Sequence, residues 1–353
     1  MNSKKWIKRW FFISTFIFSI GVFNYIIDPY GLNGFYKIEG INDKKLSNTS
    51  IATRVKTAIL QGGGFDTVML GTSRIGVIDP EVVDKHLGGK TVNLEYPASI
   101  TPIQKKLFFY ALKYNNIKNV LYGIDFLSFN QSRTIHGDFQ EFYDFETEIE
   151  NKERIFNLDM YFNLNTFYKS INIIVNNDKD FRPKESVYLM KNGMRDYINH
   201  IQDLKDRKYD LDENINKSIE NYFRKDAGEY QNYVFSYEYL KDFKEVVEYC
   251  QANNIKLWVY ISPMYSKHYD AIHERGYADE FKLFKWELSR IVEYTDMTGH
   301  TELTVNTKNY WDSSHLRKEL SETIVPVVLK KSNNLGIAKY IKKYNLEKVD
   351  SNE

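Results

Sequence analysis

The stretch TVMLGTSR, residues 67–74, decides the fold class. Its first four residues form a short apolar run, which predicts a buried strand, and the glycine that follows predicts a turn into a helix. Three further short apolar runs follow along the chain, at residues 91–94, 119–124 and 255–261. We therefore expect several short strands of one sheet, the first of them ending just before Ser73.

Helical patterns separate these runs. Within residues 102–115 the apolar residues Ile103, Leu107 and Ala111 recur at the spacing of one helix face. Residues 238–253 form a second helical pattern just before the last apolar run. Strands that alternate with amphipathic helices are typical of a parallel sheet covered on both faces. The predicted fold class is α/β.

Length and composition set further bounds. A chain of 353 residues predicts one large domain or two of ordinary size. Hydrophobic residues make up 42% and charged residues 27%, which excludes a chain that is disordered throughout. The 48 Lys and Arg nearly balance the 47 Asp and Glu, so we expect no nucleic acid as a partner. The single cysteine, Cys250, excludes an intramolecular disulfide and a cysteine-rich metal site.

The N-terminus differs from the rest of the chain. Four Lys and Arg in residues 1–9 precede an uncharged, apolar stretch at residues 10–27. At about 1.5 Å per residue a helix over this stretch reaches roughly 27 Å, close to the hydrocarbon thickness of a bilayer. The basic cluster before it and Asp28 after it predict a single-pass membrane anchor, with a cytoplasmic N-terminus and an extracytoplasmic domain over residues 28–335. A cleaved signal peptide and a buried core helix are the alternatives, although no small-x-small cleavage site follows the apolar stretch.

Residues 130–237 interrupt the alternation of strands and helices. They are rich in Asn, Asp, Lys, Tyr and Phe, and they contain helical patterns at residues 158–175 and 212–224. We expect an insertion between strands that forms a cap near the mouth of a site. Residues 336–353 are expected to be a C-terminal surface tail.

Two short motifs are candidates for chemistry. Ser73 follows the first strand and begins a helix, and the carboxyl ends of parallel strands form the ligand crevice of an open α/β sheet. Asp312 lies three residues before His315, on a loop that leads into an expected helix at residues 317–329. Such an acid can fix the orientation of the imidazole, which then accepts the proton of a serine hydroxyl. Both motifs are also ordinary helix caps, and this alternative stays open.

Together, the early Gly-x-Ser and the late Asp-x-x-His resemble the SGNH/GDSL hydrolase superfamily. The sequences ISP at residues 261–263 and DPYG at residues 28–31 are similar to its membrane-anchored, cell-envelope branch, which includes exopolysaccharide O-acetyltransferases and the teichoic-acid D-alanylation protein. The resemblance implies a flavodoxin-like three-layer sandwich with a parallel sheet. It also implies Ser73 as the nucleophile, His315 as general base and acid, and Asp312 as the orienting carboxylate.

Two positions depart from the family pattern for the oxyanion hole. The second sequence motif of the family, which supplies a glycine N–H to the oxyanion hole, would fall at residues 93–99, and these contain no glycine. We expect the backbone N–H of Ala98 to act as the donor instead, beside that of Ser73. In the third motif Asp125 stands where the family carries an asparagine, and an ionised carboxylate would repel an oxyanion. Losing one side-chain donor costs on the order of 3 kcal/mol of transition-state stabilisation.

Other residues are candidates for substrate contacts. Arg74 is expected either to bind an anionic group of the substrate or to pair with Asp125, and a purely structural arginine is the plainer alternative. Tyr265 and His268 are expected at the rim of the crevice, with an ordinary loop role as the alternative. The histidines at positions 136, 200, 273 and 300 lack metal-ligand spacing, so no metal site is predicted. No glycine-rich phosphate loop is present, so no nucleotide cofactor is predicted either.

The resemblance therefore implies acyl transfer to a cell-envelope polysaccharide, or removal of an acyl ester from it, through an acyl-serine intermediate. The resemblance implies a membrane-bound O-acyltransferase as a partner that hands acyl groups through the membrane. Two alternatives remain. One is a catalytically silent domain that binds polysaccharide or scaffolds a synthesis complex, and the other is an unrelated α/β protein in which both motifs are caps.

Overall fold

The computed structural model describes residues 3–33, 38–43, 45–135, 139–140, 158–177, 187–196, 206, 210–226, 228–332, 334 and 336–344. The chain divides into two compact units, which are described separately. The helical unit comprises residues 1–59 and 136–190, and the sheet unit comprises residues 60–135 and 191–353.

The sheet unit is built around one six-stranded sheet in its described part. Its strands are β1 (Thr67–Gly71), β2 (Thr91–Asn93), β3 (Asn119–Ile124), β6 (Lys256–Ile261), β7 (Tyr294–Asp296) and β8 (Lys339–Ile341). The first five are parallel to one another, and β8 pairs antiparallel with β7 at the edge. The expected α/β fold with a mostly parallel sheet is confirmed.

The order of the strands places a crevice beside β1. Along the sheet the order is β2-β1-β3-β6-β7-β8. When the five parallel strands alone are counted along the chain, this order is 2-1-3-4-5, which is common in doubly wound sheets. In such sheets ligands bind at the carboxyl ends of the strands, where the order reverses. The reversal occurs at β1, which lies between β2 and β3. Residues that directly follow β1 and β3 therefore flank the expected crevice.

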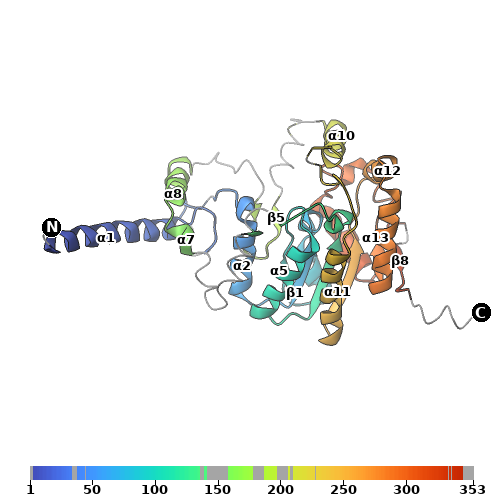
Figure 1. The fold of residues 1–353 in the computed structure, drawn as a ribbon, viewed down its shortest axis with the longest axis horizontal. Helices are drawn as coiled ribbons and strands as arrows, with labels where there is room; N and C mark the ends of the chain where they lie inside the picture. Colours follow the sequence, from blue (N-terminus) through green and yellow to red (C-terminus); the bar gives the residue numbers. More distant parts are fainter. Residues whose placement is uncertain are drawn as a thin grey trace, which may run out of the picture. The chain divides into compact units, whose positions relative to one another are not determined.

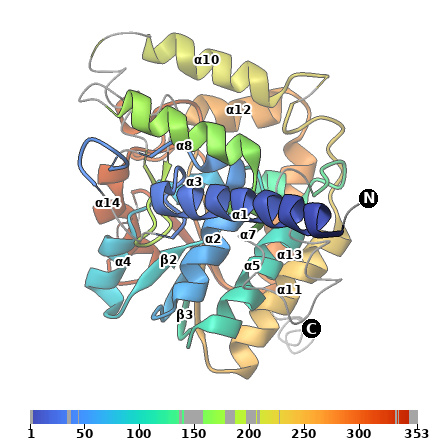
Figure 2. The same cartoon turned by 90° about the vertical axis from the view of Figure 1, so that its left-hand side faces the viewer.

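Helices cover both faces of this sheet. One face carries Met69 and Leu121, which share a core with residues of α4 (Pro80–Leu87), α10 (Leu211–Tyr222) and α14 (Ser321–Val328). The other face carries Tyr122, whose hydroxyl donates to Gln104 Oε1 of α5 (Thr101–Tyr114) over 2.7 Å and whose ring lies 5.3 Å from that of Phe243 in α11 (Tyr237–Ala252). Figure 2 shows α4 and α14 on one side of the unit and α5 and α11 on the other.

The remaining elements of the sheet unit are short or lie near its carboxyl edge. They are β5 (Arg195–Asp196), α3 (Ser73–Gly76), α12 (Ser266–Glu274), α13 (Ala278–Ile291) and the 3₁₀ turns η2 (Phe126–Phe129), η4 (Thr307–Asn309) and η5 (Lys318–Leu320). Helix α2 (Ala52–Gly62) precedes the sheet in the chain, and the boundary between the two units falls within it.

Local sequence explains where several helices begin and end. Asp79 caps α4 by accepting a hydrogen bond from the Glu81 N–H over 3.0 Å, and Pro80 occupies the first turn, where its missing N–H does no harm. Ser236 caps α11 in the same way through the Tyr239 N–H. Between α2 and β1, Gly63 and Gly64 both have positive φ, so the glycine run forms a turn there.

The C-terminal region differs from the expectation at two places. The helix expected at residues 317–329 begins only at Ser321, because Tyr310 and Leu316 form an antiparallel bridge and η5 follows it. The expected surface tail at residues 336–353 contributes β8, which covers the edge of β7. Residues 345–353 of that tail lie outside the described residues.

The helical unit contains α1 (Ser3–Ile27), the 3₁₀ turn η1 (Thr49–Ile51), α7 (Leu158–Tyr161), α8 (Leu164–Asn176) and β4 (Val187–Tyr188). Helix α1 is long and apolar enough to cross a membrane, and most of its large apolar side chains are exposed in the structure. It ends where expected. Asp28 takes a left-handed conformation with φ 47°, and its carboxylate accepts from the Leu32 N–H over 2.8 Å.

The insertion expected at residues 130–237 is divided between the two units. Its described helices are α7 and α8 in the helical unit and α10 in the sheet unit, close to the two helical patterns in the sequence. Figure 1 shows α7 and α8 beside the C-terminal end of α1.

Candidate active site

Ser73 stands at the carboxyl end of β1, on the first residue of the four-residue helix α3. Thr72 caps this helix by accepting a hydrogen bond from the Arg74 N–H over 3.3 Å. The Ser73 side chain is therefore not the helix cap. Gly71 has φ +147°, and a Cβ at this position would collide with the carbonyl oxygen of Gly123 in β3. Only glycine fits so close an approach of the two strands ahead of the serine.

A hydrogen-bonded relay joins Ser73 to the distant acid–base motif. Ser73 Oγ lies 2.7 Å from His315 Nε2, and His315 Nδ1 lies 2.8 Å from Asp312 Oδ2. The two ends of the first contact are 242 positions apart in the chain. The structure therefore brings together the serine, histidine and aspartate that the sequence singled out, in the order that nucleophilic catalysis requires.

Asp312 is held as a carboxylate by its surroundings. Its Oδ1 accepts hydrogen bonds from the backbone N–H groups of Ser314 (2.7 Å) and His315 (2.9 Å). Burial alone would raise the pKa of Asp312, but the imidazole of His315 and these donors outweigh it and hold the pKa well below its usual range. An ionised Asp312 favours the Nδ1–H tautomer of His315, which leaves Nε2 free to accept a proton from Ser73.

Helix α10 braces the loop that carries this acid–base pair. Asn214 Nδ2 donates to the carbonyl of Trp311 over 2.9 Å. One turn later Ser218 Oγ lies 2.8 Å from Ser313 Oγ, and after another turn Tyr222 Oη lies 2.8 Å from Ser314 Oγ. The sequence analysis did not identify these contacts. The signal for them is the i, i+4, i+8 spacing of the three polar residues, which places them on one face of α10.

His268 and Tyr265, expected at the rim, are packed against the same loop. His268 is fully buried in α12, with Nδ1 2.8 Å from Ser313 Oγ and Nε2 3.2 Å from the hydroxyl of Tyr230. Burial, and then the nearby positive charge of Arg74, holds the pKa of His268 well below its usual value, so it is neutral. Tyr265 is also buried, and its N–H donates to the carbonyl of Ser313 over 3.0 Å.

Asp125 and Arg74 form a buried ion pair beside Ser73. Arg74 Nη1 donates to Asp125 Oδ1 over 3.0 Å, and the hydroxyl of Thr72 donates to Asp125 Oδ2. The two charged side chains are only 2% and 0% exposed. Burial opposes the charge of Arg74, but Asp125 outweighs it and raises the pKa of Arg74 well above its ordinary value. Of the two roles expected for Arg74, the structure shows the pairing with Asp125, which compensates the negative charge next to the serine.

Ala98 adopts a conformation that usually requires glycine. Its φ is +52°, and the loop around it is attached to the end of β1, because the Tyr96 N–H (3.1 Å) and the Ser99 hydroxyl (3.2 Å) both donate to the carbonyl of Gly71. Within the described part of the chain, neither the Ala98 N–H nor the Ser73 N–H has an acceptor. Both donors are therefore available to a ligand atom.

Glu95 is a further buried acid that sequence reasoning missed. It follows β2 at the same edge of the sheet, is fully buried, and packs its side chain against Gly76, where a Cβ would overlap it. Neither of its carboxyl oxygens has a hydrogen-bond partner among the described residues. An acid directly after an apolar strand is the sequence signal that marks it.

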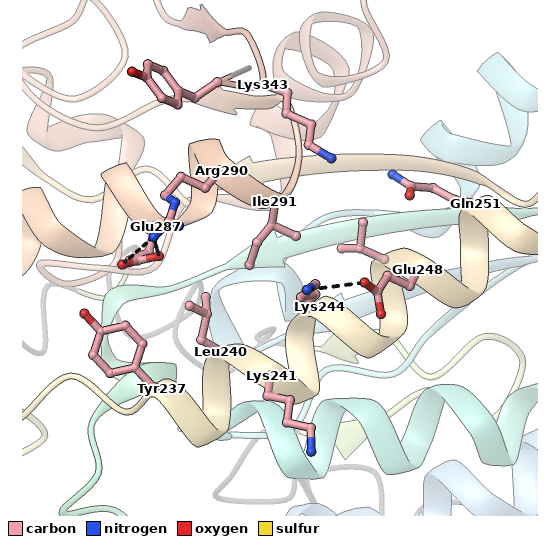
Figure 3. Close-up of a pocket in the computed structure, with 12 residues that line it drawn as sticks. Tyr237, Leu240, Lys241, Lys244, Glu248, Gln251, Glu287, Arg290, Ile291 and Lys343 are labelled. Atoms are coloured by element: carbon pink, nitrogen blue, oxygen red, sulfur yellow. Dashed lines mark hydrogen bonds and ion pairs between the residues drawn. The ribbon is translucent and has the colours of Figure 1, made fainter. Parts of the chain in front are cut away.

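The described residues contain no cluster of three or more His, Cys, Asp or Glu side chains that could hold a metal ion. Of the scattered histidines, those at positions 136 and 200 lie outside the described residues. A surface groove of about 590 Å³ runs between α11 and α13 and reaches Lys343 (Figure 3). None of the candidate site residues lines this groove, so it is separate from the relay.

Comparison with protein-family models gives no match for this sequence, and comparison with curated proteins gives none either.

Proposed function

We propose that this protein is a membrane-anchored acyltransferase or esterase of the SGNH/GDSL type, acting on a cell-envelope polysaccharide through an acyl-serine intermediate. The observation that carries the proposal is the relay from Ser73 Oγ through His315 to Asp312, with contacts of 2.7 and 2.8 Å. The 2-1-3-4-5 order of the parallel strands, which a flavodoxin-like sandwich shares, and the position of Ser73 at the reversal in that order also support it.

Acylation would begin with His315 Nε2. It accepts the proton of the Ser73 hydroxyl while Oγ attacks the carbonyl carbon of the acyl donor. The carbonyl oxygen becomes an oxyanion, which the N–H groups of Ser73 and Ala98 would stabilise. The intermediate then collapses, the bond from the carbonyl carbon to the donor oxygen breaks, and this oxygen leaves with the proton held by His315.

The second half reverses these steps with a new alcohol. A sugar hydroxyl gives its proton to His315 and attacks the acyl carbon, and the bond to Ser73 Oγ breaks as the serine regains a proton. With water as the acceptor the same steps release a free acid, which is esterase activity. The Arg74–Asp125 pair lies beside this centre with its charges balanced, so Asp125 exerts little net repulsion on the oxyanion.

The membrane assignment supports transfer over hydrolysis. Helix α1 carries four basic residues in its first turns, ahead of its apolar stretch, which favours a cytoplasmic N-terminus and an extracytoplasmic sheet unit. A tethered enzyme can receive acyl groups that a membrane-bound O-acyltransferase carries across the bilayer, and the resemblance to the anchored branch suggests such a partner.

The test compares the full-length protein with Ser73→Ala, using fluorophosphonate labelling and release of p-nitrophenol from p-nitrophenyl acetate. Ser332→Ala, an exposed serine outside the relay, is the matched control. We expect labelling and release in the native chain and in the control, and loss of both in Ser73→Ala. Absence of serine-dependent chemistry in the native chain would leave the silent, polysaccharide-binding or scaffolding alternative. Where serine-dependent chemistry is present, mass spectrometry of envelope glycans from a deletion strain would identify the acyl group and the polymer.

A further inference from the structure

Helix α8 exposes apolar residues and buries polar ones, which is the opposite of the usual distribution in a water-soluble protein. Its exposed residues include Leu164 (69% exposed), Tyr168 (69%) and Val175 (73%). Its buried residues include Thr166 and Ser170, both small and polar. In water this arrangement leaves apolar surface exposed while polar groups are buried, and a single helix that does both needs an explanation.

The residues of α8 fall into three faces at 100° per residue. The apolar face carries Phe167, Ile171 and Ile174 beside Leu164, Tyr168 and Val175. A polar, solvent-facing face carries Asn165, Lys169, Asn172 and Asn176. The third face, with Thr166, Ser170 and Ile173, is buried in the helical unit. The two faces of α8 that point away from the protein therefore differ, because one is apolar and the other is polar.

The third face attaches α8 to the end of α1. Asn24, which is fully buried near the end of the apolar helix, donates to the carbonyl of Tyr161 over 2.6 Å and accepts from Ser170 Oγ over 3.0 Å. A Cβ at Gly21 would overlap the ring of Phe162, which lies just before α8, so the glycine leaves room for that ring against α1. Figure 1 shows α8 beside the C-terminal end of α1.

The apolar surfaces of the two helices are continuous. The rings of Phe23 in α1 and Phe167 in α8 lie 5.3 Å apart, and those of Tyr25 and Tyr161 lie 5.2 Å apart. Both contacts involve the last turns of α1, which are the turns nearest the polar boundary of a bilayer if α1 spans it. The exposed apolar face of α8 therefore begins where the exposed apolar face of α1 ends.

We propose that α8 is an interfacial helix, which lies in the polar–apolar boundary of the membrane beside the anchor. Its apolar face contacts lipid acyl chains, and its Asn-rich face with Lys169 contacts headgroups and water. The occupant of the apolar face is thus the lipid of the same bilayer that α1 crosses. The proposal rests on the membrane anchor proposed above and is independent of the serine chemistry. It gives the helical unit a second membrane contact and so restrains its rotation about the anchor.

The test places single cysteines on two faces of α8 in the full-length protein in phosphatidylcholine–phosphatidylglycerol vesicles. Tyr168→Cys and Val175→Cys report on the apolar face, and Asn165→Cys and Asn176→Cys, also on exposed residues, are the matched controls. The native Cys250 can stay, because burial raises the pKa of its thiol to about 12 and leaves it unreactive at neutral pH. Each cysteine carries an environment-sensitive nitrobenzoxadiazole label, and Phe11→Cys reports on insertion of α1.

We expect blue-shifted emission at positions 168 and 175, quenched when the vesicles contain brominated lipid, and red-shifted, unquenched emission at positions 165 and 176. Equal, water-like emission at all four positions, with a quenched label at position 11, would overturn the proposal and leave the anchor intact. A blue shift at 168 and 175 without bromolipid quenching would also overturn it, because a protein partner or a second copy would then cover the face. Fluorophosphonate labelling of Ser73 in the same vesicles reports separately on the proposed activity.

Discussion

Removing the positive charge of Arg74 is expected to destabilise the sheet unit far more than removing that of an exposed partner at the same distance. Arg74 and Lys85 each make an ion pair of 3.0 Å, with Asp125 and Glu322 respectively. The first pair is 2% and 0% exposed and the second is 63% and 56% exposed. Burial is therefore the main variable that differs between them.

The expected magnitudes follow from this difference. Arg74→Met leaves Asp125 buried without its counter-charge, and among the described residues only the Thr72 hydroxyl still donates to it. Such an orphaned charge costs about 3–5 kcal/mol of the free energy of unfolding. Lys85→Met removes a solvated pair, whose contribution is below about 1 kcal/mol. The double variant Arg74→Met/Asp125→Asn leaves no orphaned charge. It should recover about 1–3 kcal/mol relative to the sum of the losses in Arg74→Met alone and Asp125→Asn alone.

Urea unfolding in detergent, followed by tryptophan fluorescence, is applied to the full-length native chain, Arg74→Met, Asp125→Asn, Lys85→Met and the double variant. The free energies give the coupling between positions 74 and 125, with Lys85→Met as the control. Equal midpoints and slopes for Arg74→Met and Lys85→Met would refute the argument from burial. Strict additivity of the double variant would refute the claim that the two charges depend on each other.

Four further outcomes are expected. Ala98→Gly removes the strain of a left-handed alanine, roughly 1–2 kcal/mol, although glycine loses more conformational entropy on folding and offsets part of this gain. Urea unfolding should therefore show equal or greater stability, and p-nitrophenyl acetate cleavage should be unchanged. Lower stability would show that Ala98 is not strained. Asp312→Asn should lower serine-dependent acyl release about 10⁴-fold with little change in KM, and a near-native rate would remove Asp312 from the relay. Because burial depresses the pKa of His268, the folded state binds fewer protons than the unfolded state below about pH 6.5. The free energy of unfolding should therefore fall as the pH drops below that value, by up to about 1.4 kcal/mol per pH unit. His268→Gln should flatten this slope, and an unchanged slope would assign it to other groups. Tyr222→Phe removes the hydrogen bond to Ser314 and should cost about 1 kcal/mol of stability together with a several-fold loss of the acylation rate, whereas an unchanged rate would show that α10 does not position the relay.

The central strands and the pairing of Ser73 with His315 were predictable because both follow from general rules. Short apolar runs between helical patterns predict parallel strands, and the carboxyl ends of those strands meet at one edge. A serine after β1 and a histidine before the last helix therefore had a common place to meet. The strand β8 was not predictable in this way, because three residues of mixed polarity carry no period and gain their pairing only from the exposed edge of β7.

The immediate surroundings of the relay were harder to predict. Asn214, Ser218 and Tyr222 look like an ordinary polar face until the loop at residues 311–315 is placed against them. Similarly, the sequence around Ala98 indicates only that a glycine is absent, whereas its positive φ depends on how the loop is attached to Gly71. His268 was expected at a rim because it follows a strand, but its burial is decided by contacts with Tyr230 and Ser313, which lie far away in the sequence.

The 242-residue separation between Ser73 and His315 has a consequence for biogenesis. During synthesis Ser73 emerges long before His315, and the intervening chain must fold before the two side chains can meet. A nascent or stalled chain therefore carries the Ser73 hydroxyl without its histidine partner. The contact between them forms only when the sheet unit has assembled from both ends of its chain.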